Sequence, residues 1–223
     1  MVDCARKRLF LAAILLILAP ILSSCLTRVG ATPERLSFSL PTTLTIERGA
    51  VLPGTDIRYE SSSDDGIYLL VDGQRALKRA GDSVKWAGSP VTGAEVELDL
   101  RVVRHTEQQV NLAGKATVVV KDVRPQAGVM DTSSQMSFSG PVAYGIAVDG
   151  YIPGTTLTYV GETEQGAELG GLYNEYPYRQ VGDSIVWEGR LRNDIYLRME
   201  LRTVQFGSDG LRVAGLATLW LGP

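Results

Sequence analysis

The chain has 223 residues, of which 44% are hydrophobic and 21% charged, and its formal net charge at pH 7 is −3. This is the balance of an ordinary globular protein, and the lack of a basic excess argues against a nucleic-acid partner. Cys4 and Cys25 are the two cysteines, so the chain beyond residue 25 offers no thiol for catalysis, zinc or iron–sulfur ligation, or a disulfide.

The first 25 residues have the three-part shape of a secretory signal. A positive region, Arg6 to Arg8, precedes fourteen uncharged residues from Leu9 to Leu22, and two serines and Cys25 follow. Such a run is shorter than the roughly 18 or more residues that a spanning helix needs. Pro20 also disfavours a continuous helix through a bilayer. The alternative to a cleaved secretory signal is that this segment stays on the protein as an uncleaved N-terminal anchor.

The segment Leu22-Ser23-Ser24-Cys25 resembles the lipobox of bacterial lipoproteins. The resemblance covers residues 1–25 and implies cleavage before Cys25, whose thiol receives lipid. It implies an extracytoplasmic protein that is held on the cell membrane or the outer membrane by several acyl chains. In the diderm members of this class, Leu26 in place of aspartate favours the outer membrane. Removal of residues 1–24 leaves 19 basic and 24 acidic side chains.

The rest of the chain repeats itself at a spacing of 100 and then 101 residues. Many short motifs recur in the same order, which chance does not produce. The clearest pairs are Ser37-Phe38-Ser39 with Ser137-Phe138-Ser139, Pro53-Gly54-Thr55 with Pro153-Gly154-Thr155, Gly81-Asp82-Ser83 with Gly182-Asp183-Ser184, and Ala113-Gly114 with Ala214-Gly215. We therefore expect a duplication.

The duplication predicts a domain plan, in which each repeated unit has a size that can fold independently. The plan is a signal peptide at 1–24, a tether at 25–35, a first β-domain at 36–122, a linker at 123–135 and a second β-domain at 136–223. The alternative is that the two units are halves of one larger sandwich or barrel.

Inside each unit the apolar residues alternate with a period of two. Val96, Leu98, Leu100 and Val102 are separated by charged residues, and Leu197, Met199 and Leu201 repeat the pattern. Such alternation is typical of an antiparallel strand with one buried face. Shorter strands are expected near 43–48, 56–60, 67–71 and 83–88, and a hairpin joins the two longest strands. The sequence predicts an all-β fold of two tandem antiparallel β-sandwich or small-barrel domains.

The repeated Gly-Asp-Ser motif, followed by Val84 or Ile185, resembles the nucleophile block of the GDSL hydrolases. That family folds as α/β and takes its base from a late Asp-x-x-His block. The one histidine here is His105, with Val102 three residues before it and Phe206 as its counterpart in the second unit. The pattern therefore favours a turn.

Other polar and aromatic residues also favour structural interpretations. Asp64 and Asp65 lack the oxygen-ligand spacing of a calcium site, so no metal or other cofactor is expected. Trp86 and Trp187 share a strand face with Val84 and Ile185, which favours burial over sugar stacking.

The second unit departs from the first in its aromatic residues. Tyr173, Tyr176 and Tyr178 replace polar and aliphatic residues of the stretch 71–78, and Trp220 replaces Val119. We name these four residues as a candidate binding patch for a glycan or a peptide. Structural packing, including a seam between the units for Trp220, is the alternative for each of them.

Two classes of function remain. The first is a non-catalytic, membrane-anchored binding or structural module of the cell envelope, which holds an envelope protein or a glycan. The second is a hydrolase of envelope or extracellular glycans that uses carboxylates alone, and it requires two facing acids in a groove. The sequence favours the first, because the recurrent acids Asp82 and Asp183 lie in expected turns.

Overall fold

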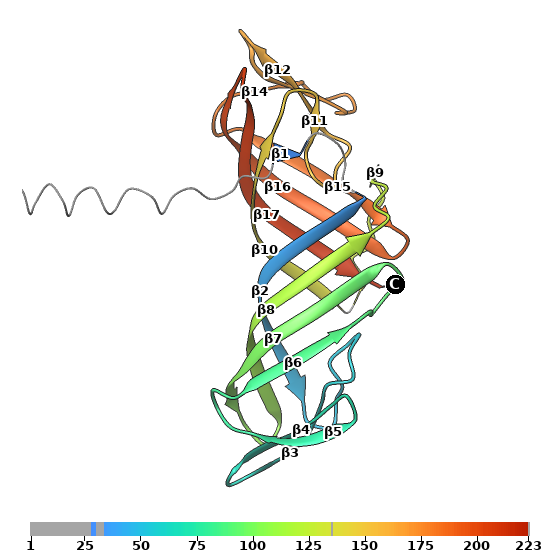
Figure 1. Ribbon diagram of the computed structural model, residues 1–223, viewed down its shortest axis with the longest axis vertical. Coiled ribbons are helices and arrows are strands. Elements are labelled where there is room, and N and C mark those ends of the chain that lie inside the picture. Colours follow the sequence, from blue (N-terminus) through green and yellow to red (C-terminus); the bar gives the residue numbers. More distant parts are fainter. Residues whose placement is uncertain (1–27, 30–33, 135, 223) are drawn as a thin grey trace, which may run out of the picture.

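The computed structural model describes residues 28–29, 34–134 and 136–222, and these residues form an all-β protein without helices (Figure 1). The strand pairs are antiparallel, except that β1 lies parallel to β10. The predicted fold class is thus confirmed at the level of an all-β, antiparallel protein. The signal segment 1–24 and Cys25 lie outside the described residues.

Residues 34–122 form a four-stranded sheet and a three-stranded sheet. The larger sheet has the order β2-β8-β7-β6 and the smaller one the order β3-β4-β5. The strands are β2 (Arg35–Glu47), β3 (Arg58–Ser63), β4 (Gly66–Val71), β5 (Gln74–Lys78), β6 (Ser83–Gly88), β7 (Ala94–His105) and β8 (Gln109–Lys121).

Residues 136–222 repeat this plan with the order β10-β17-β16-β15 for the larger sheet and β11-β12-β13-β14 for the smaller one. The short strands β1 and β9 extend the larger sheet at its two edges. The strands are β1 (Arg28–Val29), β9 (Gln126–Ala127), β10 (Met136–Ile146), β11 (Gly150–Tyr151), β12 (Thr158–Thr163), β13 (Gly166–Gly170), β14 (Tyr178–Arg179), β15 (Ser184–Arg192), β16 (Ile195–Gly207) and β17 (Gly210–Leu221).

The period-two pattern of the sequence appears directly in the burial of the long strands. Val96, Leu98, Leu100 and Val102 of β7 are all at most 1% exposed, and the charged residues between them face solvent. Trp86 and Trp187 are buried as expected, and the indole N–H of Trp187 donates to the Thr156 hydroxyl at 3.0 Å. Burial of one sheet face thus supplies the main stabilisation of each unit.

Each small sheet is tied to its large sheet by one buried tyrosine. The Tyr59 hydroxyl donates to the Thr106 carbonyl at 2.6 Å, and the Tyr159 hydroxyl donates to the Gly207 carbonyl at 2.9 Å. Both acceptors lie at the hairpin that ends β7 or β16, so the small sheets occupy opposite ends of the long axis in Figure 1. Desolvation raises the pKa of Tyr159.

The two units contact each other through equivalent residues. A Cβ placed on Gly154 would lie 2.9 Å from Leu36 Cδ1, and one on Gly54 would lie 2.7 Å from Met136 Cε. Leu36 and Met136 are counterparts in the repeat, as are the two glycines. The contacts are therefore reciprocal, which is the relation expected of a local two-fold arrangement.

Two strand predictions differ from the structure. The strand expected near 43–48 begins at Arg35, because β2 is the outer strand of its sheet and tolerates Pro41, which has no N–H to donate. The strand β5 was not expected at all. It pairs with β4 through a tight turn at Asp72 and Gly73, which both have positive φ values of 49° and 74°.

Candidate functional site

The aromatic residues of the second unit lie in a loop that replaces a hairpin of the first. In the first unit β5 pairs with β4 over five residues, whereas β14 comprises Tyr178 and Arg179 only, with one further bond from the Leu169 N–H of β13 to the Pro177 carbonyl at 2.9 Å. Pro177 accepts that bond but has no backbone N–H to donate in return, so the pairing with β13 stops there. Residues 171–177, here called the aromatic loop, are therefore left outside the sheet.

The aromatic loop presents two tyrosines to solvent. Tyr173 is 89% exposed and Tyr176 is 65% exposed, although large aromatic side chains are usually well covered. The ring of Tyr176 packs edge-on against the half-buried Tyr178, with ring centroids 5.3 Å apart. The contact with Tyr178 holds the Tyr176 ring in place, while most of that ring stays accessible to solvent.

Arg179 holds the aromatic loop from beneath. Its guanidinium donates to the backbone carbonyls of Tyr176 and Tyr178, pairs with the Glu175 carboxylate at 3.3 Å and donates to the Ser184 carbonyl at 3.1 Å. The Arg179 side chain is only 13% exposed, whereas its partner Glu175 is 61% exposed, so the guanidinium is covered by the loop that it supports. The loop thus has a defined support, which lowers the entropic cost of using it for binding.

Trp220, the fourth residue of the candidate patch, lies on a different sheet. It is half-buried on the outer face of β17, beside Tyr196 of β16 and Ser137 of β10, while Leu219 and Leu221 are buried on the inner face. The aromatic loop belongs to the small sheet at one end of the molecule, and β17 ends near its middle (Figure 1). The structure brings Tyr176 and Tyr178 together, with Tyr173 in the same loop, and places Trp220 elsewhere.

The repeated Gly-Asp-Ser segments form turns. The Asp82 carboxylate accepts a hydrogen bond from the Arg79 backbone N–H at 2.8 Å, and Asp183 accepts one from Gln180 at 2.7 Å. Ser83 and Ser184 are exposed and begin strands β6 and β15. Both aspartates therefore have the same turn-closing role in the two units.

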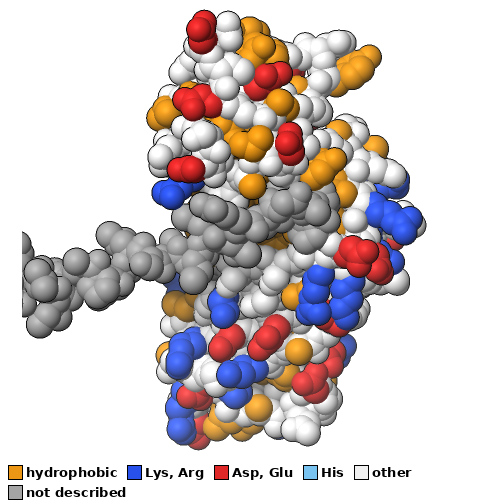
Figure 2. All heavy atoms as spheres, turned by 45° about the horizontal axis from the view of Figure 1, so that its top comes forward, with side chains coloured by type: hydrophobic (Ala, Val, Ile, Leu, Met, Phe, Trp, Pro, Cys, Tyr) orange, Lys and Arg blue, Asp and Glu red, His pale blue; other side chains and the backbone are white. Residues whose placement is uncertain are grey.

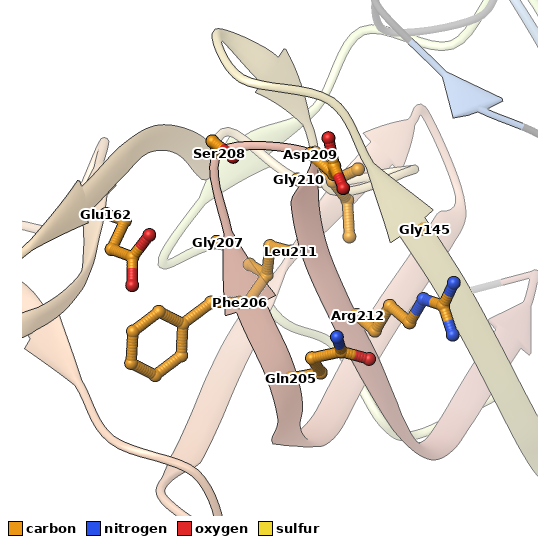
Figure 3. Close-up of a pocket in the computed structure, with 11 residues that line it drawn as sticks. Gly145, Glu162, Gln205, Phe206, Gly207, Ser208, Asp209, Gly210, Leu211 and Arg212 are labelled. Carbon is orange, nitrogen blue, oxygen red and sulfur yellow. The ribbon is translucent and has the colours of Figure 1, made fainter.

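A hollow of about 330 Å³ lies at the tip of the β16–β17 hairpin (Figure 3). Its polar lining includes Glu162, Ser208, Asp209 and Arg212, and Phe206 is beside them. In Figure 3 the carboxylates of Glu162 and Asp209 lie on either side of the hairpin tip and do not face each other. This arrangement differs from the facing pair that carboxylate-only hydrolysis needs.

The carboxyl groups with a shifted pKa are stabilised in their charged form. The hydrogen bond from the Lys121 ammonium lowers the pKa of Glu95, and hydrogen bonds from the hydroxyl and backbone N–H of Ser133 lower that of Asp131. An acid catalyst at neutral pH needs a shift in the opposite direction. In the described part of the chain, no group of three or more His, Cys, Asp and Glu side chains is placed to hold a metal ion.

One half-buried tyrosine and one buried threonine of the second unit have no polar counterpart in the first. Tyr144 and Thr203 both face Val213 across the ladder, at places where the first unit has Leu44 and Val102. Burial raises the pKa of Tyr144 to about 12, and within the described residues the Thr203 hydroxyl finds no hydrogen-bond partner. Such residues can be identified in the sequence by aligning the two repeats and looking for polar residues at positions that are apolar in the other repeat.

Comparison of the chain with family models, with curated proteins and with solved structures gives no match. Within the described residues, no helix has the length and apolar character needed to cross a membrane.

Proposed function

We propose that this protein is an extracytoplasmic lipoprotein that serves as a non-catalytic binding module of the cell envelope. Lipid on Cys25 attaches the chain to the cell membrane or the outer membrane, and the aromatic loop holds a glycan or a peptide of an envelope partner. The observation that carries the binding role is the exposure of Tyr173 and Tyr176, which are 89% and 65% accessible.

The difference between the two units supports a function for the aromatic loop. The first unit has Asp72 and Arg75 where the second has Tyr173 and Tyr176, and its hairpin forms without tyrosines at these two positions, with Arg75 stacked over the ring of Tyr68 in β4. The fold therefore does not require tyrosines at these places. Tyrosine offers a large, rigid surface with a polar tip, which suits both sugar rings and peptide segments.

The support under the loop favours binding over spacing alone. A spacer needs no ordered loop, whereas the Arg179 guanidinium fixes the backbone by hydrogen bonds to the carbonyls of Tyr176 and Tyr178. Preorganisation of this kind raises affinity because less conformational freedom is lost on binding.

We also propose that residues 36–122 and 136–223 are two tandem sandwich-like domains that act as one rigid body. The reciprocal contacts of Leu36 with Gly154 and of Met136 with Gly54 support this arrangement. A rigid pair holds the aromatic loop at a fixed place relative to the rest of the molecule.

The binding role is tested by retention on purified cell-wall glycan and on solubilised envelope proteins. We expect wild-type protein to be retained by one of these fractions, and Tyr173→Ala/Tyr176→Ala to lose most of that retention. Tyr151→Ala is the matched control, because it removes a partly exposed tyrosine of the same unit outside the loop. Equal retention of the wild type and the double variant contradicts the proposal.

A further inference from the structure

Three arginines gather where the linker meets the second unit. Arg124 belongs to the linker, and Arg190 and Arg192 lie at the end of β15. On the side of the molecule that carries β9 and β15, which is on the right in both views, Lys and Arg side chains lie close together beside acidic ones (Figure 2).

The backbone of the linker is fixed against β15. The Arg124 N–H donates to the Leu191 carbonyl at 2.8 Å, and the Gly128 N–H donates to the Glu188 carbonyl at 2.9 Å. Between these two bonds, Gln126 and Ala127 pair with Arg190 and Gly189 as strand β9. The arginines are thus held near one another by main-chain hydrogen bonds rather than by chance side-chain positions.

These arginines line a hollow of about 380 Å³ whose other walls are Asp122, Gln126 and Asn193. Asp122 pairs with Arg192 at 3.1 Å, and the guanidinium of Arg190 donates to the Gln126 side chain. Three positive groups therefore face one negative group, in a chain whose formal net charge is −3. Like charges that line one hollow repel each other, and a bound anion relieves the repulsion.

The first unit has no equivalent of this cluster. Ser89 and Val91 stand at the positions of Arg190 and Arg192, so the fold accepts small or apolar residues there. A guanidinium also has five N–H donors, and Arg190 and Arg192 direct few of them to protein acceptors. The other N–H groups of these two side chains have no protein acceptor among the described residues.

We propose that this hollow, here called the arginine hollow, binds a phosphate group of an anionic ligand. The planar fork of a guanidinium matches two phosphate oxygens, and charge-assisted bonds of this kind are stronger than neutral ones. The phosphate belongs either to a small soluble molecule or to a lipid headgroup. The site is separate from the aromatic loop and does not depend on lipidation of Cys25.

The proposal is tested by calorimetric titration with pyrophosphate at low ionic strength. The chain used begins at Leu26 and therefore contains every described residue. We expect saturable binding that is at least tenfold weaker in Arg190→Ser/Arg192→Val, which restores the residues of the first unit. Arg48→Ser/Arg104→Val removes the same charge from exposed positions elsewhere and is expected to leave binding nearly unchanged.

Arg124→Ser provides a second variant, because Arg192 also donates to the Lys121 carbonyl at 3.1 Å and its loss can weaken the fold. The Arg124 side chain is exposed, and its structural bond comes from the backbone, so this variant keeps the fold. Binding to vesicles of phosphatidylcholine with phosphatidylglycerol, compared with phosphatidylcholine alone, distinguishes a lipid headgroup from a soluble phosphate. Absence of pyrophosphate binding, or an equal loss in the control variant, overturns the proposal.

Discussion

The contact between the two units predicts that Gly154→Ala is strongly destabilising. Gly154 has a φ of +78°, where an L-residue pays about 1–2 kcal/mol. The new Cβ would lie 2.9 Å from both Leu36 Cδ1 and Leu197 Cδ2, and forced packing of this kind costs about 1–3 kcal/mol. The total expected loss in the free energy of unfolding is about 2–5 kcal/mol.

Gly73→Ala separates the two contributions. Gly73 has a φ of +74°, but a Cβ there would have no heavy atom within 4 Å. This variant is expected to pay only the backbone cost of about 1–2 kcal/mol. Urea unfolding followed by tryptophan fluorescence measures both variants against the wild type. Equal losses for Gly154→Ala and Gly73→Ala would contradict this prediction, because they would mean that neither Leu36 nor Leu197 resists a Cβ at position 154.

Three further predictions concern single groups. Burial raises the pKa of Tyr144 from 10.0 to about 12, so between pH 10 and pH 12 the unfolded chain loses the Tyr144 proton while the folded chain keeps it. The free energy of unfolding therefore falls as the pH rises from 10 to 12. Chemical unfolding across this range should show the wild type losing up to about 2.7 kcal/mol relative to Tyr144→Phe, and parallel pH profiles would contradict this. Tyr173→Ala/Tyr176→Ala should change the free energy of unfolding by no more than about 0.5 kcal/mol, because both side chains are exposed, and a larger loss in thermal unfolding would indicate a packing role. Cys25→Ser should move the protein from the membrane fraction to the soluble one or leave it with an uncleaved signal. If mass spectrometry finds a normally lipidated N-terminus in this variant, Cys25 is not the site of lipid attachment.

The main sheets could be predicted from sequence because their signal is local. Val96 to Val102 alternate strictly, and the repeat shows the same alternation at Leu197 to Leu201, so two independent copies indicate the same buried face. Strand limits were less accurate at Pro41, because β2 is the last hydrogen-bonded strand of its sheet and packs there against Gly140 of β10, so it can include a residue without an N–H.

The candidate site was predictable only in part. The tyrosines of the aromatic loop stand out in sequence because they replace polar residues of the first unit, and the structure places Tyr173 and Tyr176 in solvent. The separation of Trp220 from this loop depends on which sheet each strand joins, which is a long-range property. The arginine hollow depends in the same way on pairing between β9 and β15, so spacing along the chain did not reveal it.

The binding role of the aromatic loop is tested most directly by photocrosslinking in living cells. A photoreactive amino acid replaces Tyr173 in the second unit or, as the matched position, Asp72 in the first. We expect a discrete adduct with an envelope component from position 173 and none from position 72. Adducts of equal yield at both positions, or none at position 173, would contradict a binding role for the aromatic loop.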